Sequence, residues 1–79
     1  MPIPINIALA NVLKRKRESL HLSQEDVSVG VQCNRMTVSM WESGKQEIRL
    51  THLHEVLKIF DMSLVDFFKD VEEEMKKGQ

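Results

Sequence analysis

The apolar residues of this 79-residue chain recur at every third or fourth position, which is the spacing of helices that bury one face. The clearest set is Leu53, Val56, Leu57 and Phe60, which fall at i, i+3, i+4 and i+7. β-Branched residues never alternate over the length of a strand, and glycine and proline are few. The pattern therefore predicts an all-α fold of five helices.

Capping residues define the expected helix boundaries. Asn6 offers a cap for the first helix, and Ser23 followed by Asp26 has the spacing of a capping box at the start of the second. Ser63 offers a similar cap to the fifth helix, and Gly44 is the residue type expected just after the third. The expected helices span about 6–20, 23–31, 34–43, 51–60 and 63–77.

The length predicts one domain, residues 1–79, with its core in residues 6–70. At this size folding buries only about 60% of the surface of the unfolded chain, so the stability margin is small. The first dozen residues do not read as a signal peptide, and no apolar run reaches the roughly 18 residues that span a bilayer. We expect no membrane association and no second, ligand-binding domain.

The residues that usually carry chemistry are sparse. Cys33 is the single cysteine, so the chain has no internal disulfide, which indicates a reducing compartment such as the cytoplasm. His52 and His54 point about 200° apart on a helix, which is wrong for a shared metal site. No nucleophile with a base and no carboxylate pair has a workable spacing. We therefore expect no enzymatic activity, no cofactor and no metal.

The net charge of −1 hides an asymmetry along the chain. Residues 1–50 carry seven Lys or Arg and five Asp or Glu, a net charge of +2, whereas residues 51–79 carry four and seven, a net charge of −3. An anionic partner is steered toward the basic half. The run Lys14 to Arg17 sweeps about 300° around a helix, so it is interpreted as a solvated face with one or two recruited members.

The segment 23–43 predicts two short helices joined by about three residues. Such a corner lays its second helix into the major groove of DNA if that helix is buried on one side only. Val38 and Trp41 supply the buried side. Arginine fits the acceptors of guanine, asparagine fits adenine, and an apolar side chain can contact the thymine methyl group, so Asn34, Arg35 and Met36 are candidates for base contacts.

The sequence LSQEDVSVGVQCNRMTVSMWESGK, followed by LTHLHEVLKIFDMSLVDFF, resembles the Cro/repressor (XRE-like) helix-turn-helix family over roughly Leu9 to Phe68. The resemblance implies a five-helix, lambda-repressor-like domain that regulates transcription. Small restriction-modification controllers and phage or plasmid Cro-like repressors are equally close in their organisation.

Residue roles follow from the resemblance position by position. It implies a structural salt bridge between Arg17 and Glu42. For Met36 and Met40, contact with thymine methyl groups and packing against a protein both stay open. The implied DNA-binding residues are Gln24, Asn34, Arg35, Met36, Thr37, Ser39, Met40, Ser43 and Lys45.

Several positions depart from the family pattern. Gln32 replaces the turn glycine, Ser28 an alanine, Ile48 a proline, and Lys16 an apolar residue. A left-handed Gln32 costs about 1–2 kcal/mol, and Gly30 inside a helix costs up to about 1 kcal/mol. The departures therefore make the turn the least predictable part of the corner.

The apolar stripe of the last helix extends beyond what a small core needs, so we predict a homodimer interface there. Its predicted members are Leu64, Phe68, Val71 and Met75. The acidic run Glu72 to Glu74 is expected to form a solvated outer face. The expected function is regulation of transcription, with autoregulation, by a homodimer on a palindromic double-stranded DNA operator, without a small-molecule ligand. The alternative is a protein-interaction module of the antitoxin or anti-repressor type.

Overall fold

The computed structural model describes residues 2–78, and all regular secondary structure in that range is α-helical. The predicted all-α, five-helix fold is confirmed. None of these helices is long and apolar enough to span a bilayer. The helices are α1 (Ile5–Ser19), α2 (Gln24–Gly30), α3 (Arg35–Ser43), α4 (Leu50–Ile59) and α5 (Leu64–Lys76).

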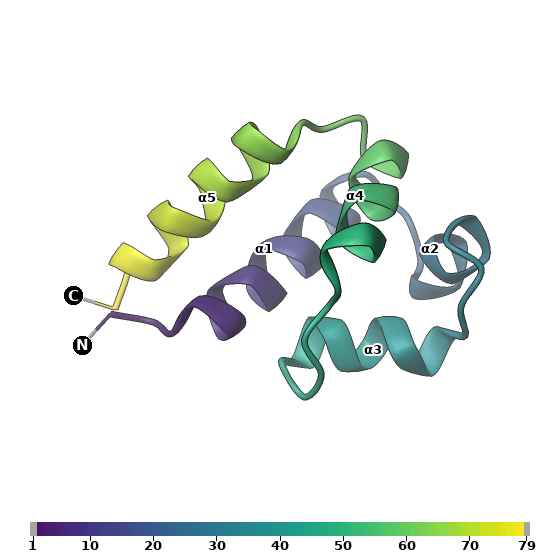
Figure 1. The fold of residues 1–79 in the computed structure, drawn as a ribbon, viewed down its shortest axis with the longest axis horizontal. Helices are drawn as coiled ribbons and strands as arrows, with labels where there is room; N and C mark the ends of the chain where they lie inside the picture. The colour runs from purple at the N-terminus through teal and green to yellow at the C-terminus, as the bar shows by residue number, and fades with distance from the viewer. Residues whose placement is uncertain (1, 79) are drawn as a thin grey trace.

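The five helices place the corner and the chain ends at opposite sides of the molecule (Figure 1). α1 packs against α5 and α3, while α2 packs against α3 and α4. α5 runs beside α1, and the backbone N–H of Ile3 donates to the carbonyl of Met75 at 3.0 Å. The α1–α5 pair therefore forms a support that leaves α2 and α3 exposed at the far end.

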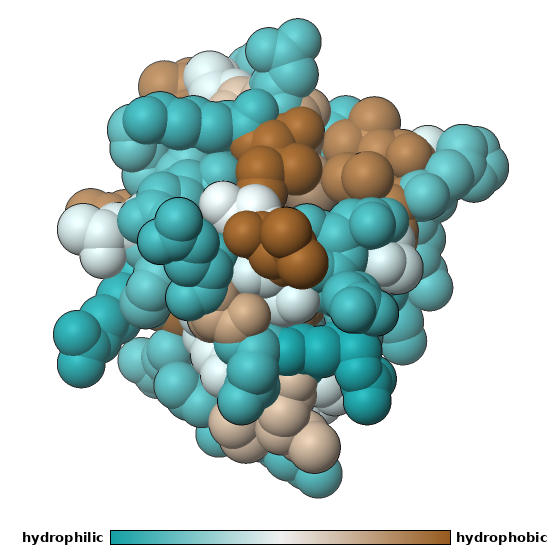
Figure 2. All heavy atoms as spheres, turned by 90° about the vertical axis from the view of Figure 1, so that its right-hand side faces the viewer, coloured by the Kyte–Doolittle hydropathy of each residue, from teal (hydrophilic) through white to brown (hydrophobic). Residues whose placement is uncertain are grey.

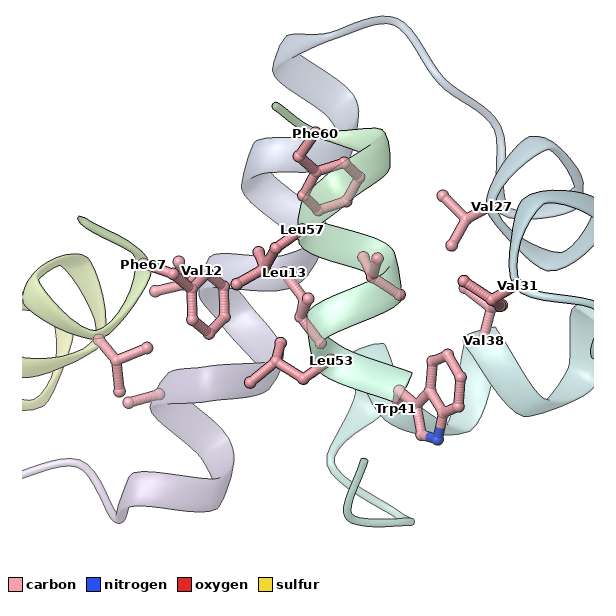
Figure 3. Packing of buried hydrophobic residues seen from close by; sticks show 13 residues of the cluster. Val12, Leu13, Val27, Val31, Val38, Trp41, Leu53, Leu57, Phe60 and Phe67 are labelled. Carbon is pink, nitrogen blue, oxygen red and sulfur yellow. The ribbon is translucent and has the colours of Figure 1, made fainter. Parts of the chain in front are cut away.

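One continuous core joins all five helices. Figure 3 shows Val27, Val31 and Val38 facing α4 from the corner, while Leu13 lies between α1 and α4. The buried residues include Leu53 and Leu57 of α4 and Phe67 of α5, each at most 2% exposed. α4 therefore connects the corner to the α1–α5 support.

The first helix starts earlier than predicted. α1 begins at Ile5 with Pro4 at its cap position and no side-chain cap, so the prediction that Asn6 caps it is wrong. Proline suits this place because its fixed φ favours helix initiation and its missing N–H loses no helical hydrogen bond. Leu20, at the predicted end of this helix, lies just after it and is 39% exposed.

α5 also differs from its prediction, because its buried face is rotated toward α1. Glu74 is 6% exposed and accepts hydrogen bonds from Arg15 at 2.9 Å and Asn11 at 3.1 Å. It is therefore not part of a solvated acidic face. Val71 is 1% exposed within the core of the single chain, so it has no surface to offer a second subunit, contrary to the prediction.

All four connections between consecutive helices use the same backbone turn. Each contains one residue with positive φ, and the residue after it donates its N–H to a carbonyl five positions back, as in a Schellman motif. Only one of the four is a glycine. The four positive-φ residues are His21, Gln32, Gly44 and Asp61.

The turn at Gln32 follows this pattern closely. Gln32 has φ 58°, its N–H donates to the carbonyl of Val29 at 3.3 Å, and the N–H of Cys33 donates to the carbonyl of Ser28 at 2.9 Å. The left-handed conformation considered for Gln32 is therefore present. Glutamine bends this corner with the hydrogen bonds that glycine forms elsewhere in the chain.

Gly30 has a packing role rather than a turn role. A Cβ atom at Gly30 would lie 2.5 Å from Cδ1 of Ile59 on α4. Such a distance requires Ile59 to move, so the absent side chain lets the end of α2 approach α4 closely. This contact explains why the glycine lies before the turn instead of in it.

Candidate nucleic-acid interface

Capping hydrogen bonds define the two helices of the corner. Ser23 Oγ accepts from the N–H of Asp26 at 2.9 Å, and the Asp26 carboxylate accepts from the N–H of Ser23 at 2.8 Å. The hydrogen bond from the backbone N–H of Ser23 and, less strongly, the Ser23 side chain hold the pKa of Asp26 below its usual value. The capping box predicted at the start of α2 is therefore present, and it fixes where the helix begins.

α3 is buried on one side only. Val38 and Trp41 are 2% and 3% exposed, whereas Met36 is 59% exposed and Arg35 is also exposed. The remaining members of the predicted DNA-binding set on or after α3 are partly or fully exposed. These are Thr37, Ser39 and Met40, which are partly buried, and Ser43 and Lys45, which are exposed.

Trp41 anchors the buried side of α3. Its ring lies against the start of α4, where the His52 ring is 5.4 Å away between centroids (Figure 3). Gly44 ends the helix with φ 78°, and a Cβ there would lie 2.8 Å from Cδ1 of Ile7. Both features fix the far end of α3 and leave its first turn projecting from the protein.

Asn34 is the N-cap of α3 rather than its first helical residue. Its Oδ1 accepts from the N–H of Thr37 at 3.0 Å and from Thr37 Oγ1 at 3.3 Å. Paired recognition of adenine by asparagine needs both the oxygen and the amide nitrogen. Since the oxygen of Asn34 is engaged, only its N–H groups remain for DNA unless the cap opens.

A buried polar network joins α1 to both helices of the corner. Arg17 donates from Nε and Nη2 to the two carboxylate oxygens of Glu42, at 2.7 and 3.1 Å, and from Nη1 to the carbonyl of Leu22 at 2.6 Å. The hydrogen bonds from Arg17 to Glu42 raise the pKa of Arg17. Gln24 Nε2 also donates to Glu42, at 3.1 Å.

This network assigns Gln24 a contact within the protein that was not predicted. One of its two amide N–H groups binds Glu42, so the side chain is oriented and one N–H remains for a ligand. The buried charge of Glu42 is compensated by Arg17, which avoids the large cost of an unpaired buried carboxylate.

A hollow of about 130 Å³ lies beside the exposed face of α3. It is lined by Lys14, Gln24, Ser39, Glu42 and Ser43, which come from three helices. Lys14 was not among the predicted site residues. Its position three residues before Arg17 is the signal that could have indicated it, because such residues share one face of a helix.

The surface formed around α2 and α3 is mostly hydrophilic (Figure 2). Hydrophobic side chains gather across the middle and upper right of this view. The strongly exposed apolar residues of these two helices are Val29, at 70%, and Met36, at 59%. The face therefore combines polar groups with a small apolar component.

Cys33 lies in the turn and is partly buried. Burial and, to a smaller extent, the charge of Glu55 raise the pKa of its thiol. The thiol is therefore protonated at neutral pH, which disfavours reaction as a nucleophile.

The arrangement of α2 and α3 against a helical support defines a helix-turn-helix protein. The helix-turn-helix family model matches residues 13–67, so the chain belongs to the helix-turn-helix family, as the sequence resemblance predicted. This is not a family of enzymes.

The chain is similar to a control protein and to proteins of known structure. The control protein C.MunI of Mycoplasma sp. is 31% identical over 71 residues, covering 89% of this chain and 96% of the relative. The clp gene regulator ClgR from Corynebacterium glutamicum has a TM-score of 0.92 at 17% identity, covering 99% of this chain and 83% of that one.

A third similar protein is the restriction-modification controller protein C.Esp1396I, solved as a tetramer in complex with its natural 35 base-pair operator. It has a TM-score of 0.81 at 22% identity, covering 90% of this chain and 93% of that one. At these identities the two structural likenesses show a shared fold.

Proposed function

We propose that this protein is a sequence-specific DNA-binding regulator of transcription that lays α3 into the major groove. The observation that carries the proposal is the one-sided burial of α3. Val38 and Trp41 hold one side in the core, while Arg35 and Met36 project from the first turn. A recognition helix needs one buried and one exposed side, because the protein must hold one side while the other contacts base edges.

Base recognition is assigned to the exposed first turn and the residues that follow it on the same side. Arg35 can offer its forked guanidinium to the two acceptors of guanine, and Met36 can contact the methyl group of thymine. Met40 and Thr37 lie beside them, with smaller exposed areas. Asn34 contributes through its amide N–H groups because its oxygen caps the helix.

Contacts with the DNA backbone are assigned to the C-terminal end of α3 and to Gln24 on α2. Lys45 is exposed just after α3, and Ser43 is exposed at its last residue. Lysine and serine are both suited to bind phosphate, and such contacts set register and affinity without reading sequence. Gln24 offers the amide N–H that Glu42 does not occupy.

The proposed active species is a homodimer on a roughly palindromic operator. Two recognition helices about 34 Å apart can reach successive turns of the major groove. The proposed interface is on α5, where Leu64, Phe68 and Met75 remain partly exposed and Val65 is 77% exposed. The tetrameric, operator-bound assembly of C.Esp1396I supports a multimeric regulator.

Val65→Glu tests this interface with little risk to the fold, because Val65 contributes little to the core. Sedimentation velocity should show a dimer for the wild type and a shift to monomer for this variant. Thr51→Glu, at an exposed position on α4, is the control for one added negative charge. Unchanged association of Val65→Glu would place the interface elsewhere.

A protein-interaction module is the second candidate function, because Met36 is exposed and the net charge is −1. Binding to random duplex DNA at increasing salt separates the two. A DNA-binding regulator loses affinity steeply as salt rises, since each contacted phosphate releases counterions. Absence of binding at low salt would overturn the DNA-binding proposal and favour the protein partner.

We also propose that the protein acts in the cytoplasm and controls its own gene, as small controllers without an effector do through their concentration. A nuclease footprint on the DNA upstream of the gene tests this. Protection of two related half-sites is the expected result, and protection at neither would contradict autoregulation.

A further inference from the structure

The hollow beside α3 has the chemistry of a site for one phosphate group. Its lining offers an ammonium from Lys14, an amide from Gln24 and the hydroxyl of Ser39. The Ser43 hydroxyl also lines the hollow, and it exchanges its hydrogen bond to the carbonyl of Met40, at 3.2 Å, for one to a bound phosphate. These are the donor types that contact the DNA backbone in proteins. They converge from α1, α2 and α3, so the hollow exists only in the folded corner.

Lys14 is available for such a ligand. Both arginines of the basic run on α1 are engaged, since Arg15 pairs with Glu74 at 2.9 Å and Arg17 pairs with Glu42 at 2.7 Å. Within residues 2–78, no ion pair involves Lys14. Its positive charge therefore stays uncompensated at the edge of the hollow.

The carboxylate of Glu42 also lines the hollow and would repel a phosphate if it were unpaired. Both of its oxygens are occupied, one by Arg17 Nε and the other by Arg17 Nη2 and Gln24 Nε2. The Arg17–Glu42 pair is neutral as a unit, so Lys14 sets the sign of the local charge. The hollow thus favours an anion.

The position of the hollow fits a phosphate of the DNA strand that flanks the groove. Ser39 and Ser43 lie on α3 between the buried Glu42 and the exposed Met36 when residues are placed about 100° apart around the helix. A helix in the major groove lies between two backbones, so groups at its edge meet phosphates rather than bases.

The geometry points to a DNA-backbone phosphate site formed by Lys14, Gln24, Ser39 and Ser43, with Lys14 supplying the charge. This inference rests on the proposed DNA-binding function and adds a contact from α1, outside the helix-turn-helix segment. It assigns to α1 a direct part in affinity in addition to its role as a support.

The test compares Lys14→Gln with the matched control Lys16→Gln in the full chain, on random duplex DNA over a series of salt concentrations. Lys16 lies two residues away on the same helix, about 200° around it, so both variants lose one charge from one element. Thermal unfolding by circular dichroism checks that both are folded. Lys14→Arg keeps the charge and should retain binding.

Lys14→Gln should reduce the slope of log affinity against log salt by about 0.9 per subunit and weaken binding about tenfold near 0.1 M salt. Lys16→Gln should keep the wild-type slope. Equal slopes for the two glutamine variants, whether lowered or not, would overturn the phosphate site while leaving the DNA-binding function standing. A wild-type protein that binds no DNA would overturn both.

Discussion

Arg17 on α1 donates two hydrogen bonds to the carboxylate of Glu42 on α3, at 2.7 and 3.1 Å, and both side chains are buried. Arg17 also donates to the carbonyl of Leu22, just before α2. One guanidinium therefore fixes the distance between the support helix and both helices of the corner. The proposed DNA-contacting side of α3 depends on this ion pair, although Arg17 itself is buried beneath that surface.

Arg17→Met should lower the free energy of unfolding by about 3 kcal/mol or more, because it leaves Glu42 buried without its counter-charge. Urea unfolding measures the change. Lys16→Met is the control, since it removes a neighbouring cation that forms no ion pair within the described residues 2–78. The double variant Arg17→Met with Glu42→Leu should be more stable than Arg17→Met alone. A loss below about 1 kcal/mol in Arg17→Met would contradict the importance of the pair.

Glu74 should make the stability of the fold sensitive to acid. Hydrogen bonds from Arg15, Lys77 and, less strongly, Asn11 lower its pKa from 4.5 to about 2. A carboxylate with a lowered folded-state pKa stabilises the fold above its unfolded pKa, and this stabilisation is lost as pH falls through the folded pKa. The affected window is therefore about pH 4.5 down to pH 2.

The measurement is the melting temperature between pH 7 and pH 2 for the wild type and Glu74→Gln. The difference between them should be largest near neutral pH and should shrink across the acidic window, because the wild type alone loses the contribution of Glu74. Glu73→Gln, on an exposed neighbour, controls for the loss of one charge. Parallel profiles for all three proteins would show that the contacts of Glu74 add no net stability.

Gln32→Gly should stabilise the protein by about 0.5–1 kcal/mol. The left-handed conformation costs a non-glycine residue about 1–2 kcal/mol, and glycine gives back part of that gain through the greater freedom of its unfolded chain. Gln46→Gly is the matched control, because Gln46 is exposed and does not have a positive φ. That control should be neutral or destabilising in thermal unfolding. A destabilised Gln32→Gly would show that the glutamine side chain contributes contacts of its own.

The features that sequence predicted well are local. The cap at Ser23, the glycine after α3 and the stripe of α4 each depend on residues within a few positions of one another, so spacing alone indicates them. The start of α1 was misjudged because a plausible cap at Asn6 competed with Pro4, whose fixed φ had already begun the helix.

The features that sequence missed depend on contacts between distant segments. Glu74 meets Arg15 across 59 positions of the chain, and no local pattern distinguishes it from its solvated neighbours. The sequence assigns Val71 to a dimer interface because the width of a helical stripe does not reveal which part of it packs against α1. The hollow at Lys14 escaped detection for the same reason, since its lining comes from three helices.

The assignment of base and backbone contacts is tested by comparing Arg35→Ala with Lys45→Ala on a set of operators that differ at single base pairs. Both side chains are exposed, so neither change should affect folding. Arg35→Ala should cost about 1–3 kcal/mol on the preferred operator and lose discrimination at one base step, because the forked contact with guanine is removed. Lys45→Ala should weaken binding to every sequence alike and reduce the salt slope by about 1, because it removes a phosphate contact. If the two variants lost affinity equally on all operators, Arg35 would be a backbone contact, and the reading of bases by the first turn of α3 would be wrong.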